Sequence, residues 1–147
     1  MSQTQEFRET VLTQHNKYRE IHSAPPLELC GILCERAEKR ANELTELDSM
    51  DHESTGENLF KCVESKLSGK KVVETWYEEK KLFNYDAPYD HDQHRRAGHF
   101  VQVIWNDSHR LGVGFATKDD TSYVVCYYDP SADEEKFHNN VNKPKAK

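Results

Sequence analysis

Three histidines lie within nine positions of one segment, HDQHRRAGHF, which numbers His91, His94 and His99. Imidazoles this close together can bind a transition metal, transfer protons or simply face solvent. His91 and His94 have HxxH spacing, but they follow a proline and lie among charged residues, which favours a solvated loop. His99 differs because the apolar stretch FVQVIW follows it directly. The spacing alone leaves a metal site, a catalytic site and a solvated loop open.

A glutamate on an apolar helix face is the second feature with chemical potential. Helical spacing over residues 70–83 places Val72, Trp76 and Phe83 on one face, and Glu79 falls inside the same stripe. A carboxylate on a buried face is costly unless it is paired, hydrogen-bonded or protonated. The pattern therefore predicts a specific partner for Glu79.

Helices predicted before these groups must help to position them. Apolar residues at steps of three and four predict one helix over residues 6–22 and a second up to about residue 47. His15 lies on the apolar stripe of the first helix, which is typical of a hydrogen-bonded core histidine. The segment DSMDHESTGENLF, with a glycine near its centre, then reads as a polar loop.

The second half of the chain has the pattern of strands. Residues 99–105 are almost continuously apolar and β-branched, which predicts a strand covered on both faces. Two more strands over 111–117 and 123–128 form a hairpin around the turn KDDTS. Helices followed by an antiparallel meander indicate the α+β class, with a sheet between helical layers.

Length and composition limit the function classes. A chain of 147 residues is most simply one domain. Its net charge of −6 argues against a nucleic-acid partner, which would require clustered Lys and Arg. No apolar run is long enough for a transmembrane segment.

The termini and cysteines suggest a cellular location. The polar start MSQTQEFRETVL lacks the basic and apolar regions of a secretory signal, so we expect an intracellular protein; removal of a signal peptide would make a secreted one look the same. Four cysteines without metal-binding spacing favour reduced thiols, with Cys62 and Cys126 as the only candidate disulfide.

Six motifs in order resemble those of the CAP superfamily, which contains cysteine-rich secretory proteins, antigen 5 and plant pathogenesis-related proteins. The strongest is GHFVQVIW at 98–105. The others are HNKYR at 15–19, PPLEL at 25–29, GENL at 56–59, WYEE at 76–79 and VVCYYDP at 124–130. The chain most resembles the Golgi-associated plant pathogenesis-related group, although Ser2 stands where that group has its myristoylated glycine, Val101 replaces a threonine, and Ala132-Asp133 replaces Gly-Asn.

This resemblance implies a fold and a site. The fold is a three-layer αβα sandwich with a central antiparallel sheet, in a single domain over 1–147 whose core spans about 4–135 and whose polar tail spans 136–147. The site is a cleft lined by two histidines and two glutamates, which by motif are His52, Glu57, Glu79 and His99. Two imidazoles with open positions suit Zn²⁺ or another divalent metal, and the carboxylates could orient the imidazoles or hold metal-bound water.

Three functions remain open. The resemblance favours a non-enzymatic binding module that associates with lipids, sterols or membrane surfaces and with protein partners, including a second copy in a homodimer. On Golgi or other endomembranes, a basic surface could support this binding; its candidates are Lys61, Lys66, Lys70, Lys71, Lys80 and Lys81. The alternatives are a metal-dependent hydrolase with Glu57 or Glu79 as general base, and a structural protein whose four groups brace the fold.

Overall fold

A computed structural model describes residues 3–47, 57–63, 68–83, 97–132, 140–141 and 143–144. In chain order its elements are α1 (Gln3–Ile21), β1 (Glu28–Leu29), α2 (Gly31–Leu47), β2 (Glu57–Cys62), α3 (Gly69–Tyr77), the 3₁₀ helix η1 (Glu78–Leu82), α5 (Gly98–Ile104), β3 (Arg110–Lys118) and β4 (Thr121–Asp129). No described helix combines the length and apolar character needed to cross a membrane.

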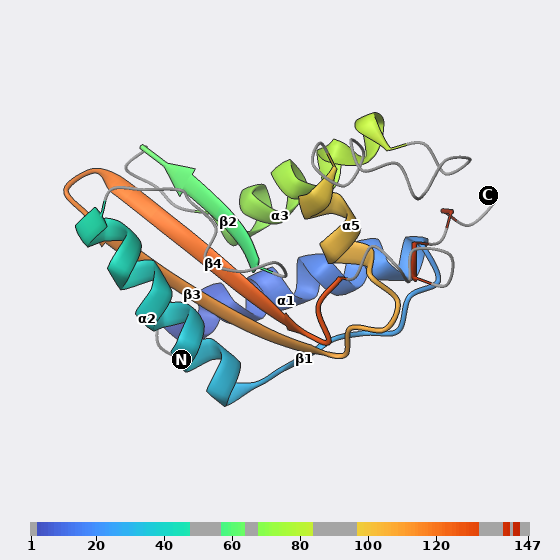
Figure 1. Cartoon of the computed structure of the whole chain (residues 1–147), viewed down its shortest axis with the longest axis horizontal. Helices are drawn as coiled ribbons and strands as arrows, with labels where there is room; N and C mark the ends of the chain where they lie inside the picture. The colour runs from blue at the N-terminus through green and yellow to red at the C-terminus, as the bar shows by residue number, and fades with distance from the viewer. Residues whose placement is uncertain are drawn as a thin grey trace.

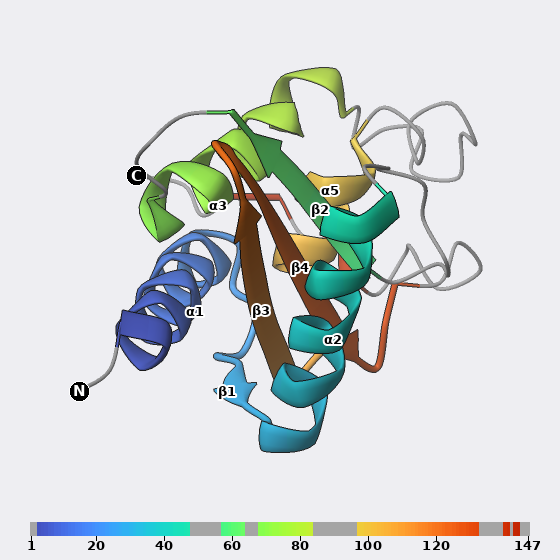
Figure 2. The same cartoon turned by 90° about the vertical axis from the view of Figure 1, so that its left-hand side faces the viewer.

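The elements form three layers around a four-stranded sheet of order β1-β3-β4-β2. The helix α2 covers one face of the sheet, and α1, α3 and α5 lie on the other (Figures 1 and 2). The α+β class and the αβα sandwich are therefore confirmed. The sheet is mixed rather than wholly antiparallel, because the two residues of β1 pair in parallel with β3.

The three long helical patterns and the hairpin occur where the sequence predicts them. The helix predicted over 70–83 begins at Gly69 and tightens into a 3₁₀ turn after Tyr77. The hairpin turns at Asp119 and Asp120, and Asp119 has a positive φ of 56°, a conformation that aspartate tolerates in tight turns.

The strand predicted over 99–105 is wrong, because Gly98–Ile104 is the helix α5. Side chains at five successive positions of this helix are buried, from Phe100 to Ile104, so it is surrounded by protein on all sides. A short apolar run without periodicity fits a fully buried helix as well as a buried strand. The third long strand of the sheet is instead β2. It begins within the segment predicted to be a polar loop and pairs with β4 along its whole length.

Two glycines allow α2 to lie directly against the sheet. A Cβ at Gly112 would overlap the backbone and Cβ of Leu33, and one at Gly114 would overlap backbone atoms of Ala37 and Glu38. Because backbone atoms cannot turn aside as a flexible side chain can, any larger residue must push the helix away from β3.

Side chains satisfy the edge of β3 beyond the two residues that β1 covers. Arg8 Nε donates to the Val113 carbonyl at 2.9 Å, and the Val113 amide donates to Cys34 Sγ at 3.4 Å. The next outward amide, that of Phe115, donates to a carboxylate oxygen of Glu38 at 3.3 Å. The Arg8 and Glu38 side chains also pair with each other at 3.4 Å, so one ion pair joins α1, α2 and the strand edge.

His15 is a hydrogen-bonded core histidine, as its position on the α1 stripe predicts. Its side chain is fully buried, with Nδ1 2.8 Å from the Val11 carbonyl and Nε2 2.7 Å from the Tyr128 hydroxyl. Burial lowers the pKa of His15 to about 4, and the nearby positive charge of Arg19 adds to this effect. The imidazole is therefore neutral at neutral pH.

All four cysteines are free, in agreement with the expectation of reduced thiols. Cys62 is opposite Ser122 in the β2–β4 register, whereas Cys126 is opposite Asn58. Four residues of register separate the two thiols, roughly 13 Å along a strand, which is too far for a disulfide.

We expect Gly114→Ala to destabilise the fold by about 3 kcal/mol, because the new methyl group would overlap the backbone of α2. Gly31→Ala is the matched control, since its Cβ would meet nothing within 4 Å, and its stability should change by less than about 0.5 kcal/mol. Urea unfolding of both variants measures the difference. Equal stability of the two would show that α2 does not depend on this close approach.

We expect stability to fall as the pH drops from about 6.5 to about 4 because of His15. In this range the unfolded chain binds a proton on the imidazole and the folded chain does not, which costs about 3 kcal/mol by pH 4. His15→Gln should flatten the pH dependence of the free energy of unfolding, whatever its effect at pH 7. The exposed His109→Gln serves as control, and a profile for His15→Gln parallel to wild type would contradict the assignment.

Candidate functional site

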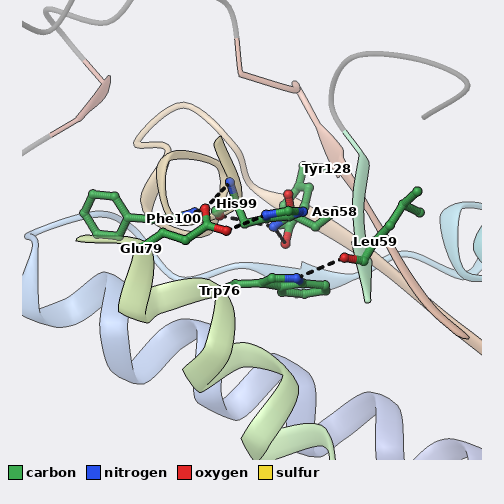
Figure 3. Close-up of polar contacts among 7 residues, drawn as sticks. All are labelled: Asn58, Leu59, Trp76, Glu79, His99, Phe100 and Tyr128. Atoms are coloured by element: carbon green, nitrogen blue, oxygen red, sulfur yellow. Dashed lines mark hydrogen bonds and ion pairs between the residues drawn. The ribbon is translucent and has the colours of Figure 1, made fainter. Parts of the chain in front are cut away.

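The partner that the sequence predicts for Glu79 is the first turn of α5. Glu79 lies on η1, and its Oε1 accepts the backbone amides of His99 at 2.9 Å and Phe100 at 3.3 Å. Its Oε2 lies 2.7 Å from Nδ1 of the His99 ring. One carboxylate thus holds both the backbone and the side chain of the same histidine (Figure 3).

This contact determines which nitrogen of the His99 ring can accept a ligand or a proton. A carboxylate accepts a hydrogen bond from Nδ1–H, which places the lone pair of the neutral imidazole on Nε2. Metal-binding histidines commonly have the same arrangement, in which a carboxylate orients the ring through the nitrogen that does not bind the metal. His99 is therefore oriented as such a ligand would be, and its side chain is 29% exposed.

Trp76 forms the floor beneath His99. The indole and imidazole rings are parallel within 7°, with centroids 5.9 Å apart, and the indole Nε1 donates to the Leu59 carbonyl of β2 at 3.2 Å. Figure 3 shows the two rings stacked, with the carboxylate of Glu79 beside them. Because Trp76 is almost fully buried, the stack gives the histidine a rigid support.

Two charged side chains from other elements hold the two ends of the short helix α5. At its N-terminus Glu79 satisfies two amides, and at its C-terminal end Arg19 donates to the carbonyls of Val103 at 3.1 Å and Trp105 at 2.8 Å. Arg19 also reaches two loop carbonyls, and its buried guanidinium has a pKa lowered to about 10 by desolvation, so it stays charged at neutral pH. Opposite charges at the two ends match the helix dipole.

Glu57 lies on the face of the sheet that α2 covers, opposite the face that packs against α5. Its register partner Tyr127 and its neighbour Leu59 pack with the α2 layer, and its carboxylate lies 3.6 Å from Nε of Arg40 on α2. Both side chains are almost completely buried, at 0% exposure for Glu57 and 8% for Arg40. The described contacts thus place Glu57 in an ion pair between the sheet and α2.

The four residues predicted to line one site are brought together only in part. The structure joins Glu79 and His99 and places Glu57 beside Arg40; His52 lies outside the described residues. Among the residues that are described, no three His, Cys, Asp or Glu side chains are grouped to hold a metal ion. The complete tetrad stays a prediction. His91, His94 and Lys66 also lie outside the described residues.

The described lysines of the predicted basic surface are partly neutralised. On α3, Lys70 Nζ is 3.8 Å from Glu74, and on η1, Lys81 Nζ is 2.8 Å from Glu78. Lys80 Nζ lies 4.6 Å from the centroid of a tyrosine ring. Ion pairs this exposed contribute little to stability, but they cancel charge locally. The surface therefore carries mixed charges along this helix.

Several residues that build the site were not singled out by sequence reasoning. Asn58, next to Glu57, bonds the backbone of His99, and Arg19 holds the far end of α5. A signal for Arg19 was present, because it follows His15 by four residues and so shares the buried face of α1. No such periodicity marks Asn58, because the polar segment that contains it predicts a loop and not the strand β2.

Comparison with known proteins identifies the family. Residues 12–128 match the Cysteine-rich secretory protein family, CAP. The chain is 34% identical to human Golgi-associated plant pathogenesis-related protein 1, over 98% of this chain and 97% of that protein. It is 30% identical to pathogenesis-related leaf protein 4 of Solanum lycopersicum, over 87% and 80% of the two chains.

Solved structures agree on the fold. The crystal structure of NaASP2 with Zn²⁺ superimposes with a TM-score of 0.72 at 21% identity, covering 98% of this chain and 85% of that one. Together with the ordered motifs and the αβα layers, the family match shows that this chain belongs to the CAP superfamily of cysteine-rich secretory and pathogenesis-related proteins.

Proposed function

We propose that this protein is a non-enzymatic CAP-domain binding module in which His99 binds a divalent metal such as Zn²⁺. The observation that carries the proposal is the contact between Glu79 and Nδ1 of His99, which orients Nε2 for a ligand. His52, the other histidine of the predicted tetrad, would supply a second imidazole, whereas Glu57 is held by Arg40 on the α2 side of the sheet. A bound divalent ion would supply a positive centre for anionic or carbonyl groups of a ligand.

The contacts around His99 fit this role. Both carboxylate oxygens of Glu79 already accept hydrogen bonds from His99 and Phe100, so Glu79 acts as the orienting group rather than as a metal ligand itself. The Trp76 stack and the anchored α5 fix the ring before any ligand arrives, which lowers the entropic cost of binding. The similar protein NaASP2, which was crystallised with Zn²⁺, adds support.

The hydrolase alternative has less support from the described residues. A general base must reach a metal-bound water, but both oxygens of Glu79 already accept hydrogen bonds, and the carboxylate of Glu57 lies next to Arg40. A structural role for the tetrad is the other alternative. It predicts that the protein binds no metal at all.

Calorimetric titration of Zn²⁺ into the metal-free protein tests the proposal. We expect His99→Ala to weaken binding at least about 100-fold, and Glu79→Gln to weaken it roughly 10-fold to 100-fold because the ring loses its orienting partner. His109→Ala, at an exposed histidine, and the double variant His91→Ala/His94→Ala should bind like wild type.

Each other outcome has a definite meaning. Loss of binding in the His91/His94 double variant would move the metal site to that segment. A wild-type protein that binds no Zn²⁺ would identify the tetrad as a structural brace. Zn²⁺-dependent turnover of ester or peptide substrates, lost in Glu57→Gln or Glu79→Gln, would instead favour the hydrolase.

The ligand class that the family resemblance supports is a lipid, sterol or membrane surface, with protein partners or a second copy as further candidates. One relative is named as Golgi-associated and another, from Candida albicans, as secreted, which supports either an endomembrane or a secreted location. Because Lys70 and Lys81 pair with glutamates, binding through this basic surface should be modest.

Flotation with anionic vesicles tests the membrane part of the proposal. We expect salt-sensitive binding that is weakened several-fold by Lys80→Glu/Lys81→Glu, because the substitutions reverse charge on the surface of η1. Lys39→Glu/Lys118→Glu, which makes the same change in charge on α2 and β3, is the control. Binding that is absent, or equally reduced by both pairs, would eliminate this surface as a lipid site.

A further inference from the structure

One buried amide connects His99 to the core of the protein. Asn58 on β2 is 2% exposed, and its Nδ2 lies 3.2 Å from the His99 carbonyl and 3.2 Å from the Tyr128 hydroxyl. Tyr128 in turn lies 2.7 Å from Nε2 of His15, whose Nδ1 lies 2.8 Å from the Val11 carbonyl. These contacts form a continuous hydrogen-bonded chain from α1 through β4 and β2 to α5.

The chemistry of the end groups fixes the direction of every bond in this chain. A backbone carbonyl only accepts, so the Asn58 group that faces His99 must be the NH₂. Its second N–H then donates to the Tyr128 oxygen, and Tyr128 must give its own proton to Nε2 of His15. The proton of neutral His15 therefore lies on Nδ1 and is donated to the carbonyl of Val11.

The protonation states agree with this direction. Burial lowers the pKa of His15 and raises that of Tyr128 well above its ordinary value, so both side chains are neutral at neutral pH. Neutral His15 can accept from Tyr128 only with its proton on Nδ1. The chain consequently has a single consistent arrangement.

His99 is therefore held at both ends of its backbone. Its amide and ring nitrogen donate to Glu79, while its carbonyl accepts from Asn58. With Glu79 as its sole partner, His99 could still rotate about the line that joins it to that carboxylate. A second contact on the opposite side of the Cα removes that freedom, which is what a pre-oriented ligand requires.

We propose that Asn58 is a positioning residue for His99, and that Tyr128 and His15 fix the orientation of the Asn58 amide. The assignment extends the site beyond the four predicted residues to a chain that starts in the core. It rests on the proposed function only insofar as His99 binds a metal, because the orientation of His99 can be measured without one.

The test compares Asn58→Ala with Asn140→Ala by ¹⁵N NMR of the histidine rings in the metal-free protein. Asn140 is the matched control, because it is also a buried asparagine whose side chain bonds to backbone: its Oδ1 accepts from the Asp107 amide, just beyond the C-terminal end of α5. The His99 signals are assigned by their loss in His99→Ala. Zn²⁺ titration of the same variants gives the second readout.

We expect wild-type His99 to show the Nδ1–H tautomer and Asn58→Ala to show a mixture of both tautomers, with Zn²⁺ affinity about 10-fold lower. Asn140→Ala should retain the wild-type ring signals and affinity. Tyr128→Phe should shift the His99 signals in the same direction by a smaller amount, because Asn58 loses its second acceptor. This variant decides the matter if Asn58→Ala fails to fold.

Wild-type His99 signals in a folded Asn58→Ala variant would overturn the proposal, as would an equal change in Asn140→Ala. For an Asn58→Ala variant that does not fold, unchanged His99 signals in Tyr128→Phe would do the same. If wild type binds no Zn²⁺ but Asn58→Ala still alters the His99 tautomer, the proposed metal function fails and the positioning role stands.

Discussion

The site depends on a short helix that could not stand alone. Seven residues are too few for a stable isolated helix, and α5 leaves amides and carbonyls exposed at its ends. Glu79 and Arg19 satisfy these groups with charges that match the helix dipole. Glu79 lies on η1 and Arg19 lies on α1. The position of His99 is thus determined by α1 and η1 as much as by its own segment.

The same elements explain how the fold and the site are coupled. Arg19 and His15 lie on the buried face of α1, so the face that packs the core also carries the polar groups that reach α5 and β4. Trp76 contacts both β2 and His99. His99, the proposed metal ligand, is 29% exposed and is therefore supported by side chains that are almost entirely buried.

Sequence reasoning predicted the elements whose periodicity is clear. The stripes of α1, α2 and α3 and the β3–β4 hairpin could be read because each element has one buried and one wetter side, or a strong turn signal. The helix α5 and the strand β2 could not: α5 is buried all round and has no stripe, while β2 begins with the polar pair Glu57 and Asn58, whose burial depends on partners distant in sequence.

The site was predictable to a similar extent. Glu79 stood out because a carboxylate in an apolar stripe requires a partner, and family motifs added His99 as a candidate. The contribution of Asn58 depends on the strand register and on Tyr128, so it emerges only from three-dimensional structure. The placement of Glu57 beside Arg40 likewise depends on which face of β2 meets α2.

The ion pair at the edge of β3 affects whether copies of this protein can associate through that strand edge. An exposed strand edge offers amides and carbonyls to any other extended chain, and this is a common route to aggregation. Arg8 and Cys34 already occupy the carbonyl and amide of Val113, and Glu38 occupies the amide of Phe115. An incoming strand would have to displace an ion pair and a thiol there, so this edge is protected against fibril-like growth without a covering strand.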